Sequence, residues 1–166
     1  MIYLIDSDAL ISAHRRYYRM EHFPSLWTWL DKQFDSKILA SITDVQSELL
    51  KFKLEDPLKI WAQNNKNYFL SMSYSDDKRN LKKITNYVNV RYNPGQHITN
   101  FIGGADIKII AKALTIKADG SDVTIVTNEQ SAPNAEHKVK IPDVCKKFGI
   151  PTMTFFDCIY NLNINI

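Results

Sequence analysis

The sequence predicts one α/β domain over residues 1–166, with a central, mainly parallel sheet of about four strands flanked by helices. Short apolar runs alternate with segments of helical periodicity, which is the pattern of parallel strands joined by helical crossovers. A length of 166 residues favours a single domain, and no internal repeat, low-complexity tract or Gly/Ser-rich linker divides the chain. The hydrophobic share of 45% is sufficient for a sizeable core.

The N-terminal half opens on residues 2–5, whose unbroken apolar run is typical of a strand buried on both faces. A helical pattern follows, and residues 38–42 form a second short strand. Thr43 and Gln46 have the spacing of a capping box, so we expect a helix with Thr43 as its N-cap. Residues 56–90 are then expected to be helical.

The C-terminal half continues with an amphipathic helix after a Gly-Gly loop. The β-branched run 123–127 is the clearest strand of the chain. Pro142 and Gly149 mark the start and the end of a further helix. A last short strand is expected to end at Phe155-Phe156, with Asp157 as the cap of a C-terminal helix.

Bulk composition limits the class of protein without naming a partner. No stretch approaches the roughly 20 apolar residues of a membrane span, and Met1 is followed at once by the first strand, so we expect neither a secretory leader nor a membrane protein. Cys145 and Cys158 lack metal-ligand spacing and are interpreted as two reduced thiols of a cytoplasmic protein. The net charge of +3 permits a polyanionic partner but does not demand one.

Acidic residues follow the predicted strands or begin the helix beside them. Asp6 and Asp8 come directly after the first strand, Glu129 follows the strand 123–127, and Asp106 begins a helix. In doubly wound sheets, ligands bind beyond the carboxyl ends of the strands. If the chain stays extended after the first strand, alternation places both aspartates on one side. Each acid alone is better explained as a helix cap, a helix-dipole partner or a solvated loop residue.

The convergence of Asp6, Asp106 and Glu129 on one sheet edge favours a metal site. Their charges would repel one another unless a divalent cation neutralised them. Oxygen donors without His or Cys ligands favour Mg²⁺ or Mn²⁺ over Zn²⁺. Such ions orient a water, lower its pKa and stabilise the charge that develops on a phosphate during in-line attack. The residues therefore indicate a metal-dependent phosphodiester hydrolase.

Two cation-rich segments suit contacts with a nucleic acid. Arg15, Arg16 and Arg19 are interleaved with tyrosines, and four cations lie within residues 78–83. Cations meet phosphates and aromatic rings stack on bases. A solvated helix face is an interpretation at least as good for each cluster alone.

The motifs taken together resemble those of PIN-domain nucleases, in the order of that family. Asp6-Ser7-Asp8 is similar to the N-terminal signature, residues 43–49 to the helix with the second acid, and residues 104–113 to the third motif. Residues 126–129 are similar to the fourth segment. The resemblance implies a three-layer, PIN-like sandwich and a ribonuclease. It assigns metal binding and catalysis to Asp6, Glu48, Asp106 and Glu129, with support from Asp8, Thr127 and Asn128.

Further segments resemble a PIN-like branch, DUF4411, whose members are often paired with a small DNA-binding antitoxin. These segments are Arg16-Tyr17-Tyr18, residues 23–30 and residues 138–145. The resemblance implies the RNase toxin of a bacterial type II toxin–antitoxin pair, with an RNA substrate, a cognate antitoxin and a homodimer. The resemblance assigns no role to Lys138 and Lys140; we interpret them as phosphate contacts to RNA, although surface solubility explains them equally well. Glu129 stands where the family usually has Asp, so we expect it to reach a metal differently or through a water.

Two rival functions stay open. One is a non-catalytic PIN-like module that binds RNA or a protein, against which the presence of the acids argues. The other is a haloacid-dehalogenase-type phosphatase, in which Asp6 would be phosphorylated and Asp8 would act as acid and base. The motif order argues against that phosphatase, because the strand that ends at Thr127 comes after Asp106.

Overall fold

One parallel sheet organises the computed structural model, which describes residues 1–73 and 75–164. Within those ranges the sheet has five strands in the order β3-β2-β1-β4-β5, and every neighbouring pair is parallel. The strands are β1 (Ile2–Ile5), β2 (Leu39–Ile42), β3 (Phe69–Leu70), β4 (Val123–Val126) and β5 (Thr152–Met153). The predicted α/β class with a central parallel sheet is confirmed.

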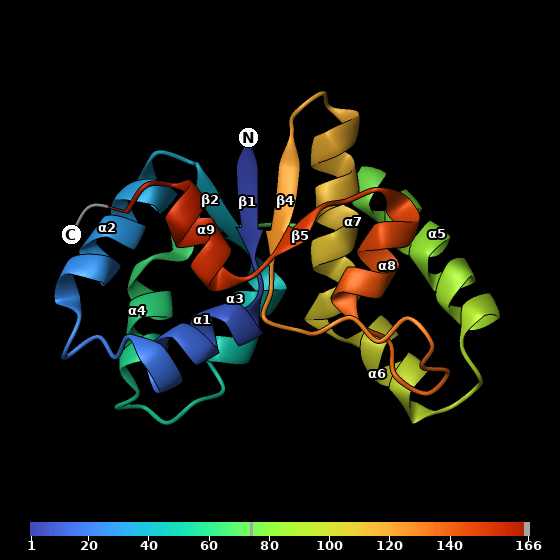
Figure 1. Ribbon diagram of the computed structural model, residues 1–166, viewed down its shortest axis with the longest axis horizontal. Coiled ribbons are helices and arrows are strands. Elements are labelled where there is room, and N and C mark those ends of the chain that lie inside the picture. Colours follow the sequence, from blue (N-terminus) through green and yellow to red (C-terminus); the bar gives the residue numbers. More distant parts are fainter. Residues whose placement is uncertain (74, 165–166) are drawn as a thin grey trace.

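Helices cover both faces of the sheet and make the fold three-layered. Figure 1 shows α1, α2, α4 and α9 on one side of the strands and α5, α6, α7 and α8 on the other. The helices are α1 (Ser7–Ser12), α2 (Pro24–Asp35), α3 (Thr43–Leu49), α4 (Pro57–Asn64), α5 (Asp76–Arg91), α6 (Gln96–Gly103), α7 (Ala105–Ala118), α8 (Ile141–Phe148) and α9 (Phe155–Asn161). A π-helical turn, η1 (Ala13–Tyr17), follows α1, and a 3₁₀ turn, η2 (Lys66–Tyr68), precedes β3. The helices on both faces explain why all four residues of β2 and of β4 are buried.

The register of the central strands determines where the sheet ends. Ile2 lies opposite Val123 and Ile5 opposite Val126, so β1 and β4 end level with each other. The next residue, Asp6, continues the pairing, since its N–H donates to the carbonyl oxygen of Val126 at 2.9 Å. The side chain that follows β1 therefore lies beside the segment that follows β4.

The predicted capping box at the start of α3 is wrong. Ile42 occupies the N-cap position and provides no side-chain cap, and α3 begins at Thr43. The Gln46 side-chain amide donates instead to the carbonyl oxygen of Ala62 at 2.8 Å. The Gln46 side chain, which the local pattern assigned to the start of α3, therefore makes a tertiary contact with α4 instead.

The prediction that residues 56–90 are helical holds only for the two ends of that range. The chain forms α4, turns through η2 into the edge strand β3, and becomes helical again in α5; residue 74 lies outside the described residues. Phe69 pairs with Ser41 and Leu70 with Ile42. Two residues are too short a run to show the periodicity of a strand. Their conformation is set by pairing with the edge of β2.

The C-terminal helix also begins differently from the prediction. Phe155 and Phe156 open α9 and do not end a strand, because β5 ends at Met153. Thr154 is the N-cap, and Asp157 completes a capping box as the third helical residue. The predicted helix between Pro142 and Gly149 is confirmed as α8, with Gly149 in the left-handed conformation that favours glycine.

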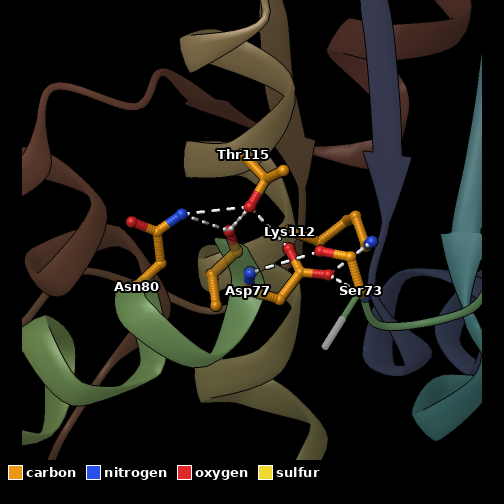
Figure 2. Close-up of polar contacts among 6 residues, drawn as sticks. Ser73, Asp77, Asn80, Lys112 and Thr115 are labelled. Carbon is orange, nitrogen blue, oxygen red and sulfur yellow. Dashed lines mark hydrogen bonds and ion pairs between the residues drawn. The ribbon is translucent and has the colours of Figure 1, made fainter. Parts of the chain in front are cut away.

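A buried ion pair joins α5 to α7 (Figure 2). Lys112 Nζ lies 2.6 Å from Asp77 Oδ2, and these residues are 8% and 0% exposed. The Thr115 hydroxyl and the Ser73 backbone N–H also donate to the Asp77 carboxylate. Burial alone would raise the pKa of Asp77, but the hydrogen bonds from Lys112, Thr115 and Ser73 outweigh it and hold the pKa below its usual value.

Two further expectations concern the environment of the chain. Within the described ranges, no helix is both long enough and apolar enough to cross a membrane. Cys145 and Cys158 are buried and unpaired, which agrees with the predicted free thiols.

We predict that Asp77→Ala lowers the free energy of unfolding by about 3 kcal/mol, because it leaves the Lys112 ammonium buried without its counter-ion. The double variant Asp77→Ala/Lys112→Met should recover part of that loss. Urea unfolding followed by circular dichroism measures both. Asp76→Ala is the matched control, since its exposed carboxylate pairs with Arg79 on the helix surface. Equal losses in the Asp76 and Asp77 variants would contradict the prediction.

Candidate acidic site at the carboxyl end of the sheet

Asp6 is the most buried acid at this end of the sheet, with 2% of its surface exposed. One carboxylate oxygen accepts the Ser7 N–H at 2.7 Å, and the other accepts the Thr127 hydroxyl at 3.2 Å. Burial, with the nearby charges of Asp106, Glu129 and Glu48, raises the pKa of Asp6 to about 7, against the lowering effect of the Ser7 N–H. Asp6 is therefore held in a dry and electronegative position.

The Asp6-Ser7-Asp8 segment does not stay extended, because α1 begins at Ser7 with Asp6 as its N-cap. The predicted alternation of Asp6 and Asp8 along a strand is therefore wrong. Asp8 is the second residue of α1, and its carboxylate accepts the hydroxyl of Ser12 at 3.3 Å. Its charge makes only a small contribution to the raised pKa of Asp106.

Asp106 is positioned by the sharp turn between α6 and α7. A Cβ at Gly104 would lie 3.0 Å from the carbonyl oxygen of Asn100, so the close turn favours glycine there. Asp106 is the second residue of α7 and is partly exposed. Burial, with the charges of Glu129 and Glu48, raises its pKa to about 6, although Lys140 acts in the opposite direction.

Glu48 and Asp44 share a face of α3 but differ in their contacts. The Lys108 ammonium donates to the Asp44 carboxylate, and this ion pair ties α3 to α7. Glu48 is half-buried and raises the pKa of both Asp6 and Asp106. Asp44 thus positions the two helices, and Glu48 adds charge to the cluster.

Glu129 is engaged by the start of α8. One of its carboxylate oxygens accepts the Lys140 ammonium at 2.9 Å, and the other accepts the Ile141 backbone N–H at 2.9 Å. Its own N–H donates to the Thr127 hydroxyl at 3.2 Å, while the neighbouring Asn128 side chain accepts the Phe155 N–H. The segment after β4 therefore anchors both α8 and α9 beside Asp6.

The four predicted ligands form an electrostatic cluster and not a closed coordination shell. Within residues 1–73 and 75–164, no three His, Cys, Asp or Glu side chains are gathered closely enough to hold a metal as they stand. Their donor chemistry nevertheless fits a hard divalent cation, because three carboxylates raise the pKa of the buried Asp6. Glu129 is the member whose two oxygens are both engaged by α8.

Two hollows adjoin the acidic cluster. The larger, of about 420 Å³, is lined by Asp106 together with His97, His137, Lys138 and Lys140. The other, of about 250 Å³, is lined by Asp8, Asn128, Arg16, Tyr17 and Phe156, among others. Acidic groups at the centre thus have cations and rings on both sides.

The predicted nucleic-acid contacts are distributed between different surfaces. Arg15 pairs with Asp56 at 3.1 Å and covers the Phe52 ring. Arg16 and Lys138 line the two hollows, and Lys140 pairs with Glu129. Arg19 is exposed on the surface.

Sequence reasoning missed the two histidines of the larger hollow. Their rings meet edge to face with centroids 5.6 Å apart, but His97 and His137 lie in separate parts of the chain with no motif spacing. It also missed that Phe156 lines the smaller hollow. The signal in the sequence is the capping box of Thr154 and Asp157, which makes Phe155 and Phe156 the first residues of a helix.

The sequence comparisons assign the chain to a family but do not assign it an activity. No curated protein matches the chain. The family described as "Domain of unknown function (DUF4411)" matches residues 3–166. Because this match spans nearly all of the sequence, the chain belongs to the DUF4411 family.

Proposed function

We propose that the protein is a metal-dependent ribonuclease that hydrolyses RNA phosphodiester bonds at the Asp6 cluster. The observation that carries this proposal is the state of Asp6, a carboxyl that is 2% exposed and whose pKa is raised first by burial and then by three other acids. A fold gains no stability from placing carboxylates together in a dry position, so such a cluster favours a functional explanation.

Mg²⁺ or Mn²⁺, when bound, supplies Lewis-acid activation of a water and of the phosphate. Asp6, Glu48 and Asp106 are the residues that would hold it. Thr127 keeps Asp6 oriented through its hydroxyl. Glu129 keeps its hydrogen bonds to Lys140 and Ile141, and its negative charge adds to that of the cluster.

The surroundings of the cluster favour a polymeric substrate over a small phosphoester. Hollows lie on two sides of the acids, and each contains a cation, Arg16 in one and Lys138 in the other. A strand that crosses the cluster can place successive phosphates near both cations. The choice of RNA over DNA rests on the resemblance to PIN-domain nucleases.

A second candidate is a non-catalytic module that binds RNA or a protein. It is favoured by the engagement of both Glu129 oxygens and by the absence of a three-ligand group among the described residues. The two proposals differ in whether wild-type protein cleaves RNA when Mg²⁺ or Mn²⁺ is present.

The cleavage prediction uses two substitutions that preserve side-chain size. Asp6→Asn and Asp106→Asn should each lower the Mn²⁺-dependent cleavage rate of single-stranded RNA by about 100-fold or more, because each removes a ligand charge. Gel electrophoresis of end-labelled RNA measures the rate. Asp119→Asn, at the opposite end of α7, is the control and should cleave normally. Undiminished cleavage in both site variants would refute the site, and wild-type binding without cleavage would favour the module.

The pKa of Asp6 predicts an unusual dependence of stability on pH. The pKa of Asp6 is about 7 in the folded protein, whereas the ordinary pKa of an aspartate is 3.8. Between these values the folded state binds more protons, so without divalent ions the contribution of Asp6 to the free energy of unfolding falls as pH rises. Urea unfolding should show Asp6→Asn gaining about 3 kcal/mol relative to wild type between pH 4.5 and pH 7.5. A difference that does not change with pH would contradict this, and Mn²⁺ should narrow the difference at pH 7.5.

We further propose that the protein acts as the toxin of a toxin–antitoxin pair and forms a homodimer, on the basis of family resemblance. Expression of wild-type protein should arrest bacterial growth, while Asp6→Asn should not. Co-expression of the product of the neighbouring gene should relieve the arrest. Growth curves and colony counts measure both effects. Arrest that persists in Asp6→Asn would separate toxicity from the acidic site.

A further inference from the structure

Two aromatic rings stand exposed beside the acidic cluster. Tyr17 is 48% exposed and Phe156 is 43% exposed. Their rings meet nearly edge to face, with centroids 5.1 Å apart, and both line the 250 Å³ hollow. Two exposed rings in contact with each other at the rim of a hollow form a small contiguous apolar patch, which is a feature of binding surfaces.

Local structure holds these rings in place. Tyr17 ends the π-helical turn η1, a rare conformation that is common at functional sites. Phe156 is the second residue of α9, directly after Phe155, which is buried in the core. The ring of Tyr18, the next residue after Tyr17, contacts the rings of Phe155 and Phe156. The carbonyl oxygen of Tyr18 accepts the Trp27 indole N–H at 2.8 Å. The rings therefore form a fixed platform.

Polar groups complete the hollow. Asn128 and Gln130 bring side-chain amides, and Arg16 brings a guanidinium that forms no ion pair within the described residues. Its neighbour Arg15 is engaged by Asp56 instead. Aromatic rings for stacking, amides for base edges and an arginine for phosphate are the groups with which proteins hold an unpaired nucleotide.

The hollow is continuous with the acidic site through shared segments. Asp8, which lines it, also acts on the pKa of Asp106. Asn128 stands between Thr127, which donates to Asp6, and Glu129. A group seated in the hollow would lie next to a phosphate at the cluster.

We propose that this hollow is a nucleobase subsite, in which an unpaired base of the RNA stacks on Phe156 and Tyr17 while Arg16 contacts an adjacent phosphate. The subsite rests on the proposed nucleic-acid substrate, but it does not depend on cleavage. It makes the enzyme selective for strands whose bases are free to leave a helix.

Binding in EDTA tests the subsite without cleavage. The probe is a fluorescent single-stranded RNA whose 2′-oxygens are methylated, in a series in which one nucleotide at a time is made abasic. Fluorescence anisotropy should find one position at which removal of the base weakens wild-type binding about tenfold. Phe156→Ala should weaken binding of the intact RNA about tenfold and abolish the effect of that abasic position.

Matched controls separate stacking from a general surface effect. Tyr160→Ala removes another exposed ring of α9, 81% exposed, that does not line the hollow, and it should bind as wild type does. Phe156→Leu keeps apolar bulk without the ring and should behave like Phe156→Ala. Arg16→Gln should weaken intact and abasic RNA alike.

The outcomes distinguish this subsite from the proposed ribonuclease. A wild-type protein whose binding ignores every abasic position overturns the subsite, and so does a Phe156→Ala protein that keeps the wild-type abasic pattern. Base-dependent binding that Phe156→Ala abolishes supports the subsite, even if no divalent ion produces cleavage and the ribonuclease proposal fails. Normal cleavage without any base-dependent binding would leave the ribonuclease standing and the subsite refuted.

Discussion

The level pairing of β1 with β4 in the middle of a parallel sheet constrains everything at the carboxyl edge. Because both strands end at the same height, Asp6 lies directly beside the end of β4, where its N–H donates to the carbonyl oxygen of Val126 before the chain turns into α1. Water is excluded there, and burial is the largest cause of the raised pKa of Asp6. The negative charges of Glu48, Asp106 and Glu129 raise the pKa of Asp6 further. A cation bound at this edge would therefore be stabilised by the surrounding carboxylates.

Helix α7 carries Asp106 to this edge and is fixed by lysines at three levels. Lys108 pairs with Asp44 of α3, Lys112 with Asp77 of α5, and Lys117 donates to the carbonyl oxygen of Gly149 after α8. The middle contact is buried, and the Asp77 carboxylate also accepts hydrogen bonds from the Ser73 backbone N–H and the Thr115 hydroxyl (Figure 2). A buried ion pair contributes orientation more than net stability. Here the pair joins α7 to α5, while Lys108 in the first turn of α7 ties that end of the helix to α3.

Charge changes sign within a short distance around the cluster. Asp6 is dry and electronegative, Glu129 is already neutralised by Lys140, and Arg16 and Lys138 line the hollows on either side. This arrangement separates two tasks, since acids suit a cation and the flanking arginine and lysine suit phosphates. The exposed rings of Tyr17 and Phe156 line the smaller hollow, whereas the rings of His97 and His137 line the larger one. The two sides of the cluster therefore present different chemical groups to the strand that we propose as substrate.

The sequence by itself determined the α/β class, the central strands and the placement of Asp6 and Asp106, because apolar runs, helical spacing and Pro/Gly boundaries are local properties of the chain. It also determined α8, whose ends are set by Pro142 and Gly149. Only the tertiary structure decided the rest. The Gln46 side chain donates to the carbonyl oxygen of Ala62 and not to the start of its own helix. Phe69 and Leu70 form a strand because they pair with the edge of β2. The Glu129 carboxylate accepts the backbone N–H of Ile141 at the start of α8. Tyr17 and Phe156 meet although they belong to opposite ends of the chain. Each of these depends on a partner far away in sequence, and no local pattern contains that information.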